Sequence, residues 1–149
     1  MSEQELRNHL RRALATVVDA EKNRVSAILN ESKIKIVDGI EKMKPITTLI
    51  RTLKEEVGEV DGLEISTTEL GDMVIVRAQM SVTTESLSIS TNHDNSVFVI
   101  EICNSDVVGN SYYDDRKEYT STEDVMARVL DVVGKHIGAQ QAQQAHKDA

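Results

Sequence analysis

The sequence predicts an α+β fold: N-terminal helices, a four- to five-stranded antiparallel meander sheet, and a C-terminal helix packed on the sheet. Three observations support this prediction. Apolar residues recur at helical spacing through about the first 57 residues. From Leu63 the apolar period changes to two, which is typical of strands with one covered face and one wet face. After Thr120 the helical period returns, so a helix is expected to close the sheet.

The first predicted helix covers residues 3–30. Ser2 and Glu5 fit a capping box, in which each side chain bonds the backbone amide of the other residue. Glu21 interrupts the apolar stripe, which favours a helix packed on a core over a strict coiled-coil seam. Asn30 is a residue type that ends helices in the left-handed conformation, so the helix is expected to stop there. The stripe consists of Leu6, Leu10, Leu14, Val17, Val18, Val25, Ile28 and Leu29.

Two further helices are predicted, one at residues 32–44 and one from Pro45 to just before Gly58. Pro45 favours a break because proline lacks an amide hydrogen and crowds the preceding turn. Residues 33–37 leave an alternative open, since Lys33-Ile34-Lys35-Ile36 alternates as a short strand does.

Four strands are predicted next, joined by short turns at Gly71-Asp72 and Asn92–Asn95. A fifth, short strand is a further candidate at residues 116–120. The apolar positions of the four strands are Leu63 and Ile65; Val74, Val76, Ala78, Met80 and Val82; Leu87 and Ile89; and the run from Val97 to Cys103.

The last predicted helix begins at a second capping box, Thr120 to Glu123, and ends at Gly138. Residues 139–149 are rich in Gln and Ala without an apolar stripe, so this tail is expected to be disordered. We expect 1–149 to be a single domain, in which the helical segment 1–57 shares one core with 58–138. The connection Gly58–Gly62 is too short for a flexible linker.

Charge is unevenly distributed along the chain. Residues 1–57 carry 11 Lys or Arg against 9 Asp or Glu, whereas residues 58–149 carry 6 against 16, a net charge of −10. An acidic surface repels the nucleic-acid backbone, so no nucleic-acid partner is expected. With one cysteine, no signal peptide and no apolar run of membrane-spanning length, the chain is expected to be cytoplasmic and to have no membrane partner.

Catalytic and metal-binding signals are weak. Cys103 could be a nucleophile with His93 as its base, but a cysteine at the end of an apolar strand is more often a packed side chain. The four histidines form no local pair of the kind that holds metal, and no glycine-rich phosphate loop is present. We therefore expect no metal, no cofactor and no enzyme activity.

The strongest surface signal is a cluster of aromatic and charged residues near the end of the predicted sheet. All four aromatic residues fall between Phe98 and Tyr119. Tyrosine and arginine anchor protein interfaces more often than most residues do, and loops held on a sheet are common binding sites. The alternative is that these tyrosines cover the sheet edge. The predicted partner-binding residues are Tyr112, Tyr113, Asp114, Asp115, Arg116 and Tyr119.

The leading hypothesis is a non-enzymatic protein-binding module, such as an adaptor, an inhibitor, an immunity protein or a chaperone-like protein, acting through an acidic sheet and loop surface. A first alternative is a small enzyme or ligand-binding domain that uses His93 with Asp94, Glu101 or Asp106. A second is a nucleic-acid binder through Arg7, Arg11 and Arg12. A homodimer is expected, because the helices carry more apolar stripe than one small sheet covers.

Overall fold

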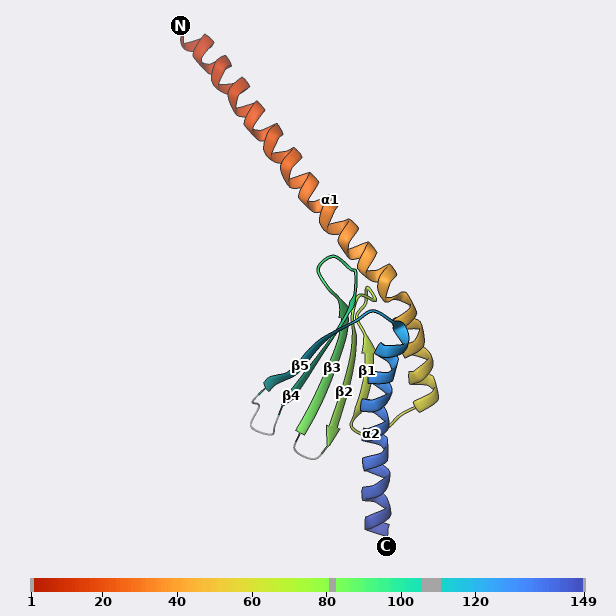
Figure 1. Cartoon of the computed structure of the whole chain (residues 1–149). Coiled ribbons are helices and arrows are strands. Elements are labelled where there is room, and N and C mark those ends of the chain that lie inside the picture. The colour runs from red at the N-terminus through yellow and green to blue at the C-terminus, as the bar shows by residue number, and fades with distance from the viewer. Residues whose placement is uncertain (1, 81–82, 106–110, 149) are drawn as a thin grey trace. The chain divides into compact units, whose positions relative to one another are not determined.

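A computed structural model describes residues 2–80, 83–105 and 111–148, with the backbone alone for 111–114. By its internal contacts the chain separates into two compact units, Met1–Val37 and Asp38–Ala149, and each is described by itself. The prediction of one domain with one core stays a prediction. The elements in chain order are α1 (Glu3–Val57), β1 (Leu63–Thr67), β2 (Val74–Met80), β3 (Thr83–Thr91), β4 (Phe98–Ser105), β5 (Ser111–Tyr119) and α2 (Thr122–Asp148), as labelled in Figure 1. The predicted α+β fold is confirmed.

The two ends of α1 are where the sequence predicts them. The Glu5 amide donates to the Ser2 hydroxyl at 3.1 Å, and the Ser2 amide donates to the Glu5 carboxylate at 3.2 Å. This reciprocal pair is a capping box. At the other end Gly58 has a positive φ of 67°, and its amide donates to the Lys54 carbonyl at 3.0 Å. That bond is the left-handed cap that glycine supplies most easily.

The interior of α1 differs from the prediction, because one helix replaces three. Asn30 does not end it, and residues 33–37 are helical rather than a strand. An exposed asparagine costs a helix interior only about 0.5 kcal/mol, which flanking helix formers offset. The predicted break at Pro45 is also wrong. Proline removes one hydrogen bond there, while Met43 and Ile46 beside it are fully buried and hold that stretch in place.

The sheet is an antiparallel meander of strand order β1-β2-β3-β4-β5. All four predicted strands are present, and the turn at residues 92–95 has Asn95 at a positive φ of 59°. The fifth strand is longer than predicted, because β5 begins at Ser111 and pairs with the whole of β4. The pairing shifts by one residue between Ile102 and Cys103, which is a β-bulge. The interpretation of residues 112–119 as a loop is therefore wrong.

One face of the sheet is covered and the other is wet, as the alternation predicts. The last third of α1 and the first half of α2 lie on the covered face (Figure 1). On the opposite face β3 presents Ser86, Ser88 and Ser90, all half-exposed. The core belongs to the unit Asp38–Ala149. Its fully buried side chains are Met43, Ile46, Ile50, Val74, Val76, Leu87, Ile89, Val125 and Val129.

Helix α2 differs from the prediction at both ends. The Asp124 amide donates to the Ser121 hydroxyl at 3.1 Å, so Ser121 rather than Thr120 caps the helix. The helix does not end at Gly138, because residues 139–148, expected to be disordered, continue it. Alanine and glutamine are strong helix formers, and several of them outweigh the cost of about 1 kcal/mol at Gly138. Gln140 also donates a hydrogen bond to the Asp61 carbonyl.

Candidate protein-binding surfaces

The unit Met1–Val37 exposes a continuous row of apolar side chains. Every residue from 2 to 38 is exposed, although many are leucine, isoleucine or valine. Leu14 and Val17 are the most open of the predicted stripe, at 64% and 65% of their maximum exposure. Single exposed apolar residues are ordinary on protein surfaces, but a contiguous apolar row marks a surface that binds another molecule. The sequence assigned these residues to a core, and within this unit they contact none.

The exposed row has a period of 11 residues. Leu6 is followed by Val17 and Ile28, Leu10 by Glu21 and Ser32, and Leu14 by Val25 and Ile36. Eleven residues make three turns of 3.67 residues, close to the helical 3.6, so such positions form an almost straight stripe. We define these nine residues as the apolar stripe. The next residues of its three rows, Gly39, Met43 and Thr47, are buried in the other unit, and so is Ile50, which follows Gly39 by 11.

Glu21 lies at the centre of the apolar stripe and is paired within its own helix. Arg24 donates two hydrogen bonds to its carboxylate, from Nε at 3.0 Å and from Nη2 at 2.5 Å. This bidentate contact lowers the pKa of Glu21 and raises that of Arg24. Because Glu21 stays charged, the stripe carries one polar layer. A polar layer of this kind sets the register of a helix pair.

The predicted binding residues at the end of the sheet lie on β5. The side chains of Tyr112, Tyr113 and Asp114 fall outside the described residues. Asp115 and Arg116 are exposed, and the Arg116 guanidinium lies 3.4 Å from the Glu101 carboxylate across the wet face. Tyr119 is half-buried and packs on the core, in the manner of the edge-covering alternative. The described members of the cluster therefore divide between surface and core.

The candidate catalytic residues belong to a turn and to a neighbouring strand. His93 and Asp94 belong to the turn after β3, while Glu101 lies on β4; Asp106 falls outside the described residues. The Asp94 carboxylate accepts a hydrogen bond from the Ser96 amide at 3.1 Å, and the contacts with Ser96 lower its pKa. A carboxylate held ionised by a turn is a poor general base. Cys103 is half-buried on β4. In the strand register it lies opposite Ser86 of β3 and Tyr113 of β5, and neither neighbour is a histidine.

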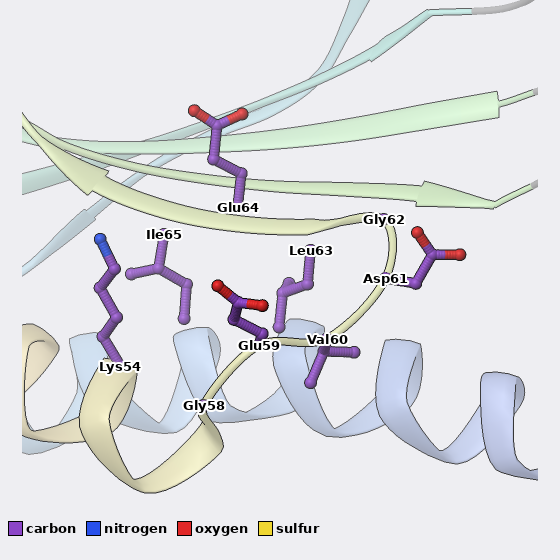
Figure 2. A pocket seen from close by; sticks show the side chains of 9 residues that line it. All are labelled: Lys54, Gly58, Glu59, Val60, Asp61, Gly62, Leu63, Glu64 and Ile65. Carbon is purple, nitrogen blue, oxygen red and sulfur yellow. The ribbon is translucent and has the colours of Figure 1, made fainter.

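A hollow of about 600 Å³ lies where α1 passes into β1. Figure 2 shows its lining, in which Leu63 and Ile65 point toward the helices and Glu64 points to the other side of the strand. Its lining carries one basic residue, Lys54, and the carboxylates of Glu59, Asp61 and Glu64. Among the residues that the structure describes, no cluster of His, Cys, Asp and Glu could hold a metal ion. The four charged residues of the lining are exposed to solvent.

A second hollow, of about 340 Å³, lies between α2 and the ends of β2 and β3. Asp131 forms ion pairs with both cations of this hollow, because Arg128 lies at 3.0 Å and Lys135 at 3.1 Å from the same carboxylate oxygen. His136, only 4% exposed, contacts the Asp61 carbonyl through Nε2 at 2.9 Å. The contacts of Asp131 join residues within α2, and the contact of His136 joins α2 to the connection before β1. These contacts therefore stabilise the fold around the hollow.

Comparison with protein families, with curated proteins and with solved structures finds no match to this chain. Among the described residues, no helix combines the length and the apolar character needed to cross a membrane.

Proposed function

We propose that the chain is a non-enzymatic protein-binding module whose main binding surface is the apolar stripe of residues 6–36. The observation that carries the proposal is that every residue of this stripe is exposed, within a regular helix. Burying one such side chain contributes roughly 1.5–3 kcal/mol, so a facing surface that covers several of them gains strong affinity. A helix that presents apolar residues along one side is a common element of protein recognition.

A second contact region is proposed on the acidic part of the chain. Residues 58–149 carry the net charge of −10, and Asp115 and Glu118 of β5 are exposed beside Arg116. This distribution suits a basic partner surface, as expected for an adaptor, an inhibitor, an immunity protein or a chaperone-like protein. Tyr112, Tyr113 and Asp114 remain part of this proposed region.

The proposal is tested by capture with the full-length chain from its own cells, quantified by mass spectrometry. The stripe variant is Leu10→Asp with Val17→Asp. The matched control is Asn8→Asp with Asn23→Asp, which adds the same charge. Asn8 precedes Leu10 by two residues and Asn23 follows Glu21 by two, so both lie about 200° round the helix, on the far side from the stripe.

The wild-type chain and the control should retain the same protein partner, and the stripe variant should lose at least about 90% of it, as expected for hot-spot positions. Circular dichroism should show equal helix content in all three proteins. Equal capture by the stripe variant and the control would overturn the proposed surface. A variant Arg116→Glu tests the acidic region separately, because it changes β5 and leaves the stripe intact.

A further inference from the structure

We infer that the apolar stripe is covered by the same segment of a second copy of this chain, paired antiparallel and centred on Glu21. The inference deepens the proposed function, on which it rests, by naming the partner of that surface. It is argued in turn from the symmetry of the stripe, from the area available and from the distribution of charge.

The stripe reads the same in both directions about Glu21. Its members lie 4, 7, 11 and 15 residues from Glu21 on each side. An antiparallel pair related by a two-fold axis at Glu21 therefore places an apolar residue against an apolar residue in most layers. The facing pairs are Val17 with Val25, Leu14 with Ile28, and Leu6 with Ile36, while Leu10 faces Ser32. A two-fold interface requires this kind of self-complementary surface.

The area is sufficient for a stable dimer. Val18 and Leu29 border the stripe and are 41% and 58% exposed. Together with the seven apolar residues of the stripe they give nine apolar side chains in each copy. At about 80 Å² per side chain, a pair of copies would bury on the order of 1,400 Å², the size of a standard specific interface. The 31 residues from Leu6 to Ile36 provide a helix about 46 Å long for this contact.

Charge selects the antiparallel arrangement. The residues after Val37 carry 10 Lys or Arg against 20 Asp or Glu, a net charge of −10. Parallel pairing would start both acidic segments at the same end of the helix pair. Antiparallel pairing starts them about 51 Å apart, several times the Debye length of about 8 Å at physiological salt.

The flanks of the stripe support the same choice. In the antiparallel pair Arg24 comes beside Glu21 of the second copy. Parallel pairing would set Arg24 against Lys22 and Lys35 against Lys33. On the other flank of the antiparallel pair Arg11 meets Lys33, and Lys22 meets its own copy; all three are exposed, and solvent and salt screen their repulsion.

The polar centre of the stripe disfavours a membrane surface as the occupant. On a lipid surface the paired charges of Glu21 and Arg24 would lie in the middle of the buried face, where lipid supplies them with no further polar partner. In the antiparallel pair the two Glu21–Arg24 pairs lie next to each other and form a group of four charges of alternating sign. That arrangement supplies each charge with a second partner.

The test uses the full chain with Cys103→Ser and two single variants, Leu14→Cys and Ile28→Cys, one of which carries a size tag. Each variant alone and the two mixed are equilibrated in a glutathione buffer and separated on a non-reducing gel. The mixture should give the mixed disulfide at least about tenfold over either homodisulfide, since only that pair brings the two Cα atoms within bridging distance. Homodisulfides from each variant alone would show parallel pairing and overturn the inference.

Analytical ultracentrifugation of the disulfide-free proteins gives an independent readout. The wild type and Asn8→Asp/Asn23→Asp should be dimers, and Leu10→Asp/Val17→Asp should raise the dissociation constant at least about 100-fold. A monomeric wild type would overturn self-pairing. If the stripe variant nevertheless loses a captured protein that the control retains, the proposed function stands with another protein as the occupant. Binding of the monomer to anionic phosphatidylserine vesicles would assign the stripe to a lipid surface and overturn both.

Discussion

His136 of α2 holds the connection between α1 and β1 in place through a hydrogen bond. The Asp61 carbonyl can only accept, so Nε2 of His136 carries the hydrogen in their 2.9 Å contact, and Gln140 donates to the same oxygen. The ring is buried, and its Nδ1 finds no hydrogen-bond partner among the residues that the structure describes. One side chain thereby satisfies a backbone carbonyl and fills the space beneath the strand.

Replacing His136 with alanine should lower the free energy of unfolding by about 2 kcal/mol. The variant loses the hydrogen bond and leaves a cavity, while Gln140 still contacts the carbonyl. Urea denaturation followed by circular dichroism measures the change. The exposed neighbour Lys135→Ala is the control and should stay within about 0.5 kcal/mol of the wild type. Equal midpoints for the two variants would contradict this account.

Gly62 should tolerate a side chain less well than Gly71, although both have a positive φ of about 75°. A Cβ on Gly62 would meet the backbone oxygen of Gln79 and the His136 ring, whereas one on Gly71 would meet no atom of the described residues within 4 Å. Gly71→Ala should therefore cost only the left-handed strain of about 1–2 kcal/mol, and Gly62→Ala clearly more. Thermal melts of both variants decide the order, and a Gly71→Ala protein melting at or below Gly62→Ala would refute it.

At the scale of the element, Pro45 is a local weakness in α1. It is exposed, so its ring adds little packing, and its nitrogen cannot donate to the Glu41 carbonyl one turn earlier. Pro45→Ala should raise the free energy of unfolding by about 1–3 kcal/mol. Lys44→Ala, also exposed, serves as the control in the same urea titration. A lower stability for Pro45→Ala would mean that the core depends on the conformation that proline imposes.

The two parts of α1 should respond differently to truncation. Ile50 is fully buried in the unit Asp38–Ala149, and Leu14 is exposed in the unit Met1–Val37. Ile50→Ala should lower the free energy of unfolding of the sheet-containing unit by about 2–5 kcal/mol. Leu14→Ala should leave it within about 0.5 kcal/mol. Hydrogen exchange at the amides of β2 and β3 reports on that unit directly, and an equal loss of protection in both variants would contradict the division.

The sequence predicted elements with strong periodicity well. The alternation of Leu87 and Ile89 with serines identified β3 and its wet face, and the Ser2–Glu5 pair identified the start of α1. Interruptions inside helices were misjudged. Asn30, Pro45 and Gly138 each carry an intrinsic cost of about 0.5–3 kcal/mol, which neighbouring helix formers or buried side chains outweigh. Residue preference alone contains no information about that compensation.

The binding surface was only partly predictable. The sequence showed that the N-terminal helices carry more apolar residues than one small sheet can cover, and this led to the prediction of a dimer. Which part of the stripe is covered depends on tertiary structure, and the first buried residue of α1 among the described residues is Gly39. The 11-residue spacing that links Leu6, Val17 and Ile28 was the signal that could have defined the stripe as one surface. In the sequence the tyrosine cluster was a clearer indication of a binding surface than the stripe was. The structure supports it less, since Tyr119 packs on the core.

For the whole molecule, the distribution of charge predicts no affinity for double-stranded DNA at physiological salt. Binding to the duplex depends on cations that release counterions, and residues 58–149 oppose it with a net charge of −10. Arg7, Arg11 and Arg12 are too few to outweigh that charge. A gel-shift titration should show no retained complex at micromolar protein. Salt-sensitive retention that Arg11→Glu abolishes would instead support the nucleic-acid alternative.

The meander order of the strands has a consequence for how the chain folds during synthesis. Each strand pairs only with its neighbours in sequence, so β1 to β5 can assemble in order as they leave the ribosome, with short loops to close. Helix α2, which shares the core with Leu87, Ile89 and Ile100, is made after all five strands. At about 5–20 residues per second, the 27 residues of α2 take roughly 1–5 s to translate. During that interval only the last third of α1 is available to cover the apolar side of the sheet, so the part that α2 covers faces water and is open to aggregation or to a chaperone.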